Sequence, residues 1–271
     1  MDGRKGLAIT LLSISRLFII DVVNMKEIIQ TTIENSQKES NNYTYPIFVA
    51  DENGKPDLLA SSVVIEVDDK AYLVTASHVL KEVMGVGGGF LIGVNTQYLT
   101  INGEFTYSES NSTDEFDIAF VELQKDFIET NKIEVLPYEN LAISPLNSKP
   151  HIAFAHGFPN SKNKQSKALR QTAAFKVKAY AFAGVIREDV VDWPKYDKDE
   201  NVHVCMSYGK KSDKSIPTHP RGISGGGLWV VPNILTDPKV KLHGVFIEYY
   251  KNDEISFSTE IGQVVDFIRS T

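Results

Sequence analysis

The chain has 271 residues, of which 42% are hydrophobic and 23% charged, and its net charge at pH 7 is −7. This composition is typical of a globular protein with a sizeable core, and the acidic balance argues against nucleic acid as the main partner. Cys205 is the only cysteine, so no disulfide can form within the chain, which favours a reducing, cytoplasmic location. We expect Cys205 to behave as a small buried hydrophobic residue.

Residues 1–24 contain an apolar run that Arg16 and Asp21 interrupt. The uninterrupted part is too short to span a membrane as a helix. No typical cleavage site follows it, so export through a weak N-terminal signal is only the alternative to a cytoplasmic location. Because Met25 is a plausible start, we interpret residues 1–24 as an upstream extension that contributes nothing to the folded domain. Residues 1–44 as a whole are expected to form an N-terminal extension and linker.

The segment after Met25 is predicted to contain one short helix. Ile28, Ile29 and Ile33 can share one helical face. The polar residues 36–42 that follow are predicted to form a linker.

From residue 45 onward, short strand-like segments alternate with turn clusters. Asp68-Asp69-Lys70 is predicted to be a tight turn between two strands, and Asn102-Gly103 is typical of a hairpin. This spacing indicates a barrel or a sandwich. The strands predicted in this half cover residues 45–49, 58–67, 71–75, 90–94, 98–101, 104–107 and 117–123.

A second group of predicted strands begins after a connector near residues 137–149. Residues 161–170 hold three lysines and one arginine and are expected to be a solvated loop. Apolar residues at helical spacing over residues 259–268 predict a terminal helix. The strands predicted in this half cover residues 152–155, 172–183, 202–208, 227–231 and 242–250.

Three short blocks bring a histidine, an aspartate and a serine in that order. They are Thr75-Ala76-Ser77-His78, Asp117-Ile118-Ala119 and Gly222-Ile223-Ser224-Gly225-Gly226. Acyl transfer by serine needs these types: a nucleophile, an imidazole that moves its proton and a carboxylate that fixes the imidazole tautomer. One glycine-rich serine turn is a weak signal, whereas three ordered blocks are far more specific.

The serine block also fits the G-x-S-x-G nucleophile elbow of α/β-hydrolases. That elbow requires a helix directly after the serine and the order serine, acid, histidine. The residues after Ser224 are three glycines and a β-prone run, and His243 is the only later histidine. The elbow is therefore rejected.

The three blocks resemble the T-A-x-H, D-I-A and G-x-S-G-G blocks of trypsin/chymotrypsin-like serine proteases, and the likeness covers roughly residues 45–265. It implies an all-β fold of two six-stranded antiparallel barrels with a C-terminal helix. The peptidase domain would occupy 45–271, with barrels at about 45–140 and 148–257 and the helix at about 259–268.

The resemblance implies a serine endopeptidase that cleaves a protein substrate through an acyl-enzyme. Ser224 would be the nucleophile, His78 the general base and Asp117 the group that orients His78. The backbone N–H groups of Gly222 and Ser224 would form the oxyanion hole. Asp114 and Glu115 are the alternative carboxylates, but they precede the strand in a polar loop.

Ile223 occupies the position at which trypsin carries an aspartate that pairs with a newly formed N-terminus. Activation by N-terminal cleavage is therefore not expected, and the resemblance is nearer to bacterial HtrA-like and glutamyl-endopeptidase-like members. The enzyme would be constitutively active or activated by a protein partner that contacts the loop Gly209–Arg221. The alternative function is a catalytically silent trypsin-like module that binds a protein partner.

By alignment with the family, the substrate pocket would have Thr218 and His219 at its floor and Ile247, Glu248 and Tyr249 along its walls. These residues do not predict which substrate side chain the pocket would prefer. No histidine pair has metal-ligand spacing, and a single cysteine excludes a cysteine-rich zinc site. Glycine patterns for nucleotides are also missing, so we expect neither a metal nor a cofactor.

Overall fold

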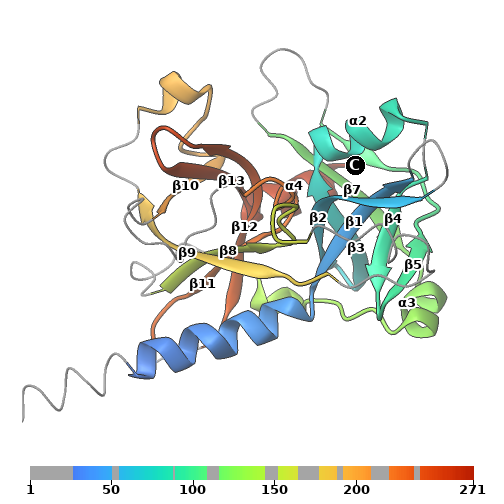
Figure 1. Cartoon of the computed structure of the whole chain (residues 1–271), viewed down its shortest axis with the longest axis horizontal. Helices are drawn as coiled ribbons and strands as arrows, with labels where there is room; N and C mark the ends of the chain where they lie inside the picture. Colours follow the sequence, from blue (N-terminus) through green and yellow to red (C-terminus); the bar gives the residue numbers. More distant parts are fainter. Residues whose placement is uncertain are drawn as a thin grey trace, which may run out of the picture.

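Two antiparallel β units lie side by side, and a helix over residues 27–41 runs beneath them in the view of Figure 1. The structure is a computed structural model. It describes residues 27–50, 55–87, 89–108, 116–143, 152–163, 177–187, 192–208, 220–234 and 239–271. The predictions for residues 1–24, and for most of the basic segment 161–170, lie outside the described residues.

The first unit is a seven-stranded sheet in the order β5-β4-β1-β2-β3-β7-β6. Asp68 and Asp69 have φ angles of 51° and 62°, the left-handed conformation that a two-residue hairpin turn requires. This turn joins β2 to β3 in the predicted place. The strands are β1 Thr44–Ala50, β2 Pro56–Val67, β3 Lys70–Ala76, β4 Leu91–Val94, β5 Gln97–Thr100, β6 Thr106–Tyr107 and β7 Ile118–Leu123.

The second unit is a closed barrel in the order β10-β13-β12-β11-β8-β9. Closure leaves no unpaired strand edge. Its strands are β8 Ile152–Gly157, β9 Tyr180–Arg187, β10 His203–Tyr208, β11 Gly227–Val231, β12 Lys241–Tyr250 and β13 Ile255–Glu260. The short helices of the chain are α2 Ser77–Gly85, α3 Lys125–Asn131, η1 Tyr138–Asn140, η3 Trp193–Tyr196 and the terminal α4 Ile261–Ser270.

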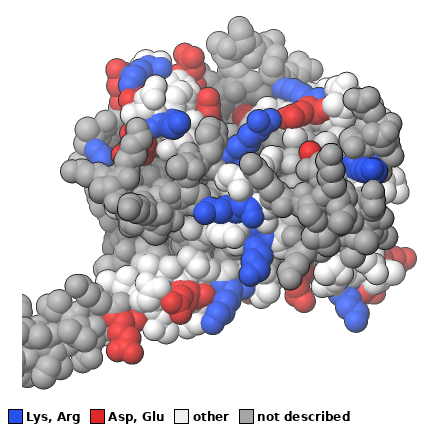
Figure 2. All heavy atoms as spheres, viewed as in Figure 1, with Lys and Arg blue, Asp and Glu red and all other residues white. Residues whose placement is uncertain are grey.

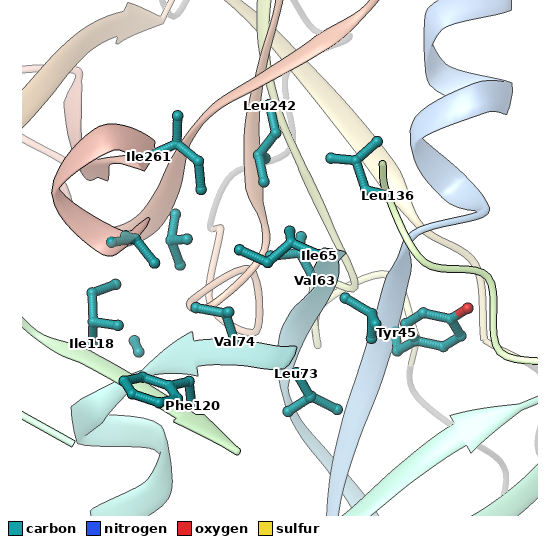
Figure 3. Close-up of a cluster of buried hydrophobic side chains, with 14 of the residues drawn as sticks. Tyr45, Val63, Ile65, Leu73, Val74, Ile118, Phe120, Leu136, Leu242 and Ile261 are labelled. Atoms are coloured by element: carbon teal, nitrogen blue, oxygen red, sulfur yellow. The ribbon is translucent and has the colours of Figure 1, made fainter. Parts of the chain in front are cut away.

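One apolar core joins the two units. Figure 3 shows Val63 and Leu73 of the first sheet in the same cluster as Leu242 of β12 and Ile261 of α4. Each of these side chains is 0% exposed, and burying one such side chain stabilises the fold by about 1.5–3 kcal/mol. Because this core spans both units, the loops at their junction are held in a fixed relation.

The predicted class is confirmed: the described chain is built mainly from two antiparallel β units and ends in a helix. The first unit has seven strands, where six in a barrel were expected. The hairpin predicted at Asn102-Gly103 is wrong, since β5 pairs with β4 and β6 with β7. The tight turn lies instead at Asn95 and Thr96, with φ angles of 47° and 71°.

The expected linker over residues 36–42 is helical as far as residue 41. Ser36 and Ser40 are buried, although the sequence there is polar. The Ser40 hydroxyl lies 2.9 Å from Nδ1 of the buried His156 of β8, and this contact holds the end of the helix against the barrel. The polar hydroxyl of Ser40 can therefore be buried at the end of this helix because it has a buried partner.

Candidate active site

Strand pairing brings His78 and Asp117 together. In the register of β3 with β7, Ala76 faces Ile118, so the residues just beyond this pair become neighbours. The N–H of Ser77 donates to the backbone oxygen of Asp117 at 3.0 Å. His78 then lies in the first turn of α2 and Asp117 immediately before β7.

Both carboxylate oxygens of Asp117 contact His78. Oδ2 lies 2.6 Å from His78 Nδ1, and Oδ1 accepts the backbone N–H of His78 at 2.9 Å. Asp117 has a φ of 46°, a conformation that is uncommon outside glycine and that the surroundings must enforce. Its side chain is 19% exposed, while the imidazole is 47% exposed. The carboxylate is thus shielded and the ring is open to a reactant.

The pKa of His78 is raised above its ordinary value. Burial is the largest influence and by itself lowers the pKa, but the hydrogen bond that Nδ1–H donates to Asp117 and the charge of Asp117 act in the opposite direction, assisted by the charges of Glu248 and Glu82. The net effect stabilises the imidazolium. With Nδ1 facing a carboxylate, Nε2 is the nitrogen that can take up a proton.

The Ser224 turn is fastened to the first sheet by Ser61 of β2. The Ser61 N–H donates to the Ser224 oxygen at 2.9 Å, and the Ser61 hydroxyl donates to the Gly222 oxygen at 2.7 Å. Thr75, three residues before His78, donates its hydroxyl to the Ser61 oxygen at 2.9 Å. The serine turn of the second unit is therefore linked, through Ser61 of β2, to the strand β3 that leads into His78.

Glycine is required at position 225 of this turn. Gly225 has a φ of 82°, and a Cβ there would collide with Thr75 Oγ1 and with the Ser61 oxygen. Gly222, with a φ of 99°, is equally close to the backbone of Phe158. Only residues without a Cβ allow the serine turn to lie this close to its neighbours.

The amide groups of the turn divide into two sets. Those of Ile223, Gly225 and Gly226 donate to the oxygens of Pro220, Phe246 and Ile223 at 3.0, 2.7 and 2.7 Å. For the N–H groups of Gly222 and Ser224, the described residues provide no recorded acceptor. The two unused donors are those expected to form the oxyanion hole.

The reacting contact itself is not made in this structure. Ser224 is half-buried, and no hydrogen bond joins its hydroxyl to His78, although both residues are described. Such contacts are often long until substrate binds. The approach of His78 Nε2 to Ser224 Oγ therefore stays a prediction.

Of the five residues expected around the pocket, the structure describes three. Thr218 and His219 lie outside the described residues. Ile247 is 3% exposed and belongs to the apolar core, so its side chain offers no surface to a substrate. Glu248 is exposed and pairs with Lys198 at 3.2 Å. Tyr249 packs against a second apolar cluster in the barrel.

Sequence reasoning missed the two residues that fasten the turn, Ser61 and Thr75. Thr75 belongs to the T-A-x-H block, but the block does not reveal its contact with Ser61, and Ser61 lies inside a β-prone run that carries no local signal. His156 is a buried structural histidine whose Nδ1 contacts Ser40, and burial lowers its pKa to about 4. In the described part of the chain, no cluster of three or more acidic, His or Cys residues could hold a metal ion.

No protein-family model matches this chain, and no curated protein does. Two solved structures that align with it come from Sesbania mosaic virus. The serine protease domain of the viral polyprotein is 10% identical, covers 82% of this chain and 91% of its own, and has a TM-score of 0.48. The second is a structure reported for the coupled folding and binding of the intrinsically disordered VPg protein. Its sequence is 10% identical, the alignment covers 83% of this chain and 95% of the other chain, and the TM-score is 0.47.

Among the helices described, none combines the length and the hydrophobicity that crossing a membrane would require.

Proposed function

We propose that this chain is a serine endopeptidase that cleaves peptide bonds in a protein substrate through an acyl-enzyme. One observation carries the proposal. The His78–Asp117 pair lies beside a glycine-rich serine turn whose recorded hydrogen bonds leave the N–H groups of Gly222 and Ser224 unused. This combination supplies a base, its orienting carboxylate, a nucleophile and two donors for an oxyanion.

In the proposed reaction, Ser224 Oγ attacks the scissile carbonyl carbon while His78 Nε2 takes the hydroxyl proton. The N–H groups of Gly222 and Ser224 stabilise the resulting oxyanion, a contribution of about 3–4 kcal/mol for one donor. His78 then gives its proton to the leaving amine, and the acyl-enzyme forms. A water molecule, deprotonated by His78, hydrolyses the ester and restores the serine. Throughout, Asp117 orients the ring and stabilises its cation.

The proposed enzyme needs no cleavage at its N-terminus. Ile223 is 0% exposed and packs in an apolar cluster, where a new charged amino group would find no carboxylate beside the serine. The turn around it is already held by Ser61. This supports an enzyme whose oxyanion turn is formed in advance. Activation by a partner at the loop Gly209–Arg221, an affinity with HtrA-like or glutamyl-endopeptidase-like enzymes and a cytoplasmic location stay predictions.

The proposal is tested by labelling with a fluorophosphonate probe, which reacts with an activated serine. Wild-type protein should be labelled, Ser224→Ala should not, and His78→Ala should be labelled far more slowly. Ser270→Ala is the matched control, because Ser270 is an exposed serine at the C-terminal end, and its labelling should equal that of the wild type. A folded wild-type protein that does not react would contradict the protease and favour the silent binding module.

A further inference from the structure

Three exposed cations lie around the serine turn without a recorded partner. Figure 2 shows a row of Lys and Arg side chains along the middle of one face, between the two β units. Beside the turn, Lys162, Lys178 and Arg221 are exposed, and within the described residues their side chains make no recorded ion pair or hydrogen bond. We call these three residues the basic surface.

Several cations elsewhere on the chain are paired. Lys70 contacts Glu122 at 2.8 Å, Lys195 contacts Asp253 at 3.1 Å, and Arg269 contacts Asp68. In a chain of net charge −7, acidic partners are abundant. The three side chains of the basic surface have no such partner among the described residues, so their charge is available to an external anion close to the serine turn.

The backbone beneath the basic surface is fixed. The Asn160 N–H donates to the Arg221 oxygen at 2.8 Å. The largely buried side chain of Asn163 donates to the Lys178 oxygen at 3.0 Å and accepts the Lys178 N–H at 2.8 Å. Arg221 directly precedes Gly222, so the basic surface is continuous with the proposed oxyanion hole. Because these backbones are already ordered, a ligand would not have to order them on binding.

The basic surface continues into a cleft between the two units. The cleft has a volume of about 530 Å³, and Lys178 and Lys132 both line it. Among the described residues of its lining, Glu134 is the only acidic one, and the others offer mainly amide, hydroxyl and apolar groups, among them Asn95 and Thr96. A cleft of this size can accept several residues of an extended peptide.

We propose that the basic surface, continued by Lys132 in the cleft, binds an acidic segment of the protein substrate that adjoins the scissile bond. This rests on the proposed protease function and assigns the substrate class to the same site. The recognised groups are Asp and Glu carboxylates, which Lys and Arg bind through charge-assisted hydrogen bonds. A polypeptide is favoured over a nucleic acid because the basic surface is contiguous with the groups that would act on a peptide carbonyl.

Binding is measured in the Ser224→Ala background, so the result does not depend on catalysis. The probe is a fluorescein-labelled ten-residue glutamate peptide, followed by fluorescence anisotropy. It should bind, binding should weaken with added salt, and the triple variant Lys162→Gln/Lys178→Gln/Arg221→Gln should bind about tenfold more weakly, since each exposed contact contributes only modestly. The matched control is Lys239→Gln/Lys251→Gln, which removes two exposed cations elsewhere and should bind as the parent does.

A second measurement addresses cleavage. Wild-type protein digests a peptide library, and mass spectrometry locates the cut bonds. Asp and Glu should be enriched on one side of the cut, and the triple variant should lose that enrichment. The proposal is overturned if the glutamate peptide does not bind, if the triple variant binds it equally well, if a ten-residue oligothymidylate binds more tightly, or if cleaved peptides show no acidic enrichment.

The two proposals fail separately. Fluorophosphonate labelling without glutamate binding would leave the protease and remove the acidic-substrate site. Glutamate binding without labelling would remove the protease, and with it a role of the basic surface in cleavage.

Discussion

Replacing Asp117 by asparagine changes one oxygen to an amide nitrogen and leaves the shape of the side chain almost unchanged. The carbonyl oxygen can keep the 2.9 Å contact with the His78 N–H. The new NH₂ group then occupies the place of the oxygen that lies 2.6 Å from Nδ1. An amide there can only donate, so Nδ1 must accept and the ring proton moves to Nε2. The nitrogen that should take the Ser224 proton is then already protonated.

From this change of tautomer we expect the rate of acylation to fall by about 10⁴-fold, which corresponds to about 5.5 kcal/mol in activation free energy. The size of the effect comes from another serine protease with the same contact. The hydrogen bond and charge of Asp117 also oppose the lowering of the His78 pKa by burial, so the pKa of His78 should fall in the variant. The fold should persist, because the side chain volume is conserved.

The assay is the pseudo-first-order rate of fluorophosphonate labelling between pH 5 and pH 9. In the wild type the rate should rise with pH as His78 loses its proton, with a midpoint above the ordinary histidine value of about 6.5. Asp117→Asn should label far more slowly at every pH. Glu122→Gln is the matched control, since it removes an exposed acid of the same strand, and its rates should equal those of the wild type. Near-normal labelling of Asp117→Asn would refute the assignment and point to Asp114 or Glu115.

Three further predictions concern stability. Gly225→Ala should lower the free energy of unfolding by about 2 kcal/mol or more and abolish labelling, because its Cβ collides with β2 and β3. The matched control is Gly87→Ala. Gly87 has a similar positive φ, but an added Cβ there would have no atom within 4 Å, so this variant should lose less stability. The pKa of His156 is lowered by burial to about 4; the unfolded chain therefore binds a proton that the folded chain does not, and stability should fall by about 3 kcal/mol as pH drops from 6.5 to 4. A chain that begins at Met25 should keep the melting temperature and the labelling rate of the full-length protein.

Each of these is checked by thermal unfolding followed by circular dichroism. Equal melting temperatures for Gly225→Ala and Gly87→Ala would mean that the close approach to β2 and β3 does not matter. His156→Gln should flatten the profile below pH 6.5, and an unchanged profile would assign the pH dependence to other groups. A drop in melting temperature or labelling for the shortened chain would show that residues 1–24 contribute to the domain.

The sequence determined the class of fold and the order of the reacting groups. Two patterns could be recognised without tertiary contacts, because each involves only residues close in sequence. One is the alternation of apolar and polar residues along the strands. The other is the helical spacing of the apolar residues Ile261, Val264, Val265 and Ile268. The same holds for the His78 and Asp117 blocks, each at the boundary of a strand that local propensity defines. That these two strands pair, and so bring His78 and Asp117 together at adjoining ends, is decided by the tertiary structure.

Only the tertiary structure decided how the serine turn is held and what surrounds it. Ser61 lies 161 residues from the Gly222 oxygen that it binds, and Ser40 lies 116 residues from His156. The basic surface likewise gathers cations from three separate segments. Contacts of this kind have no period and no local motif, because they depend on which strand edges and loops become neighbours when the apolar core closes. Propensity is a property of short stretches of chain, whereas these contacts are a property of the packed molecule.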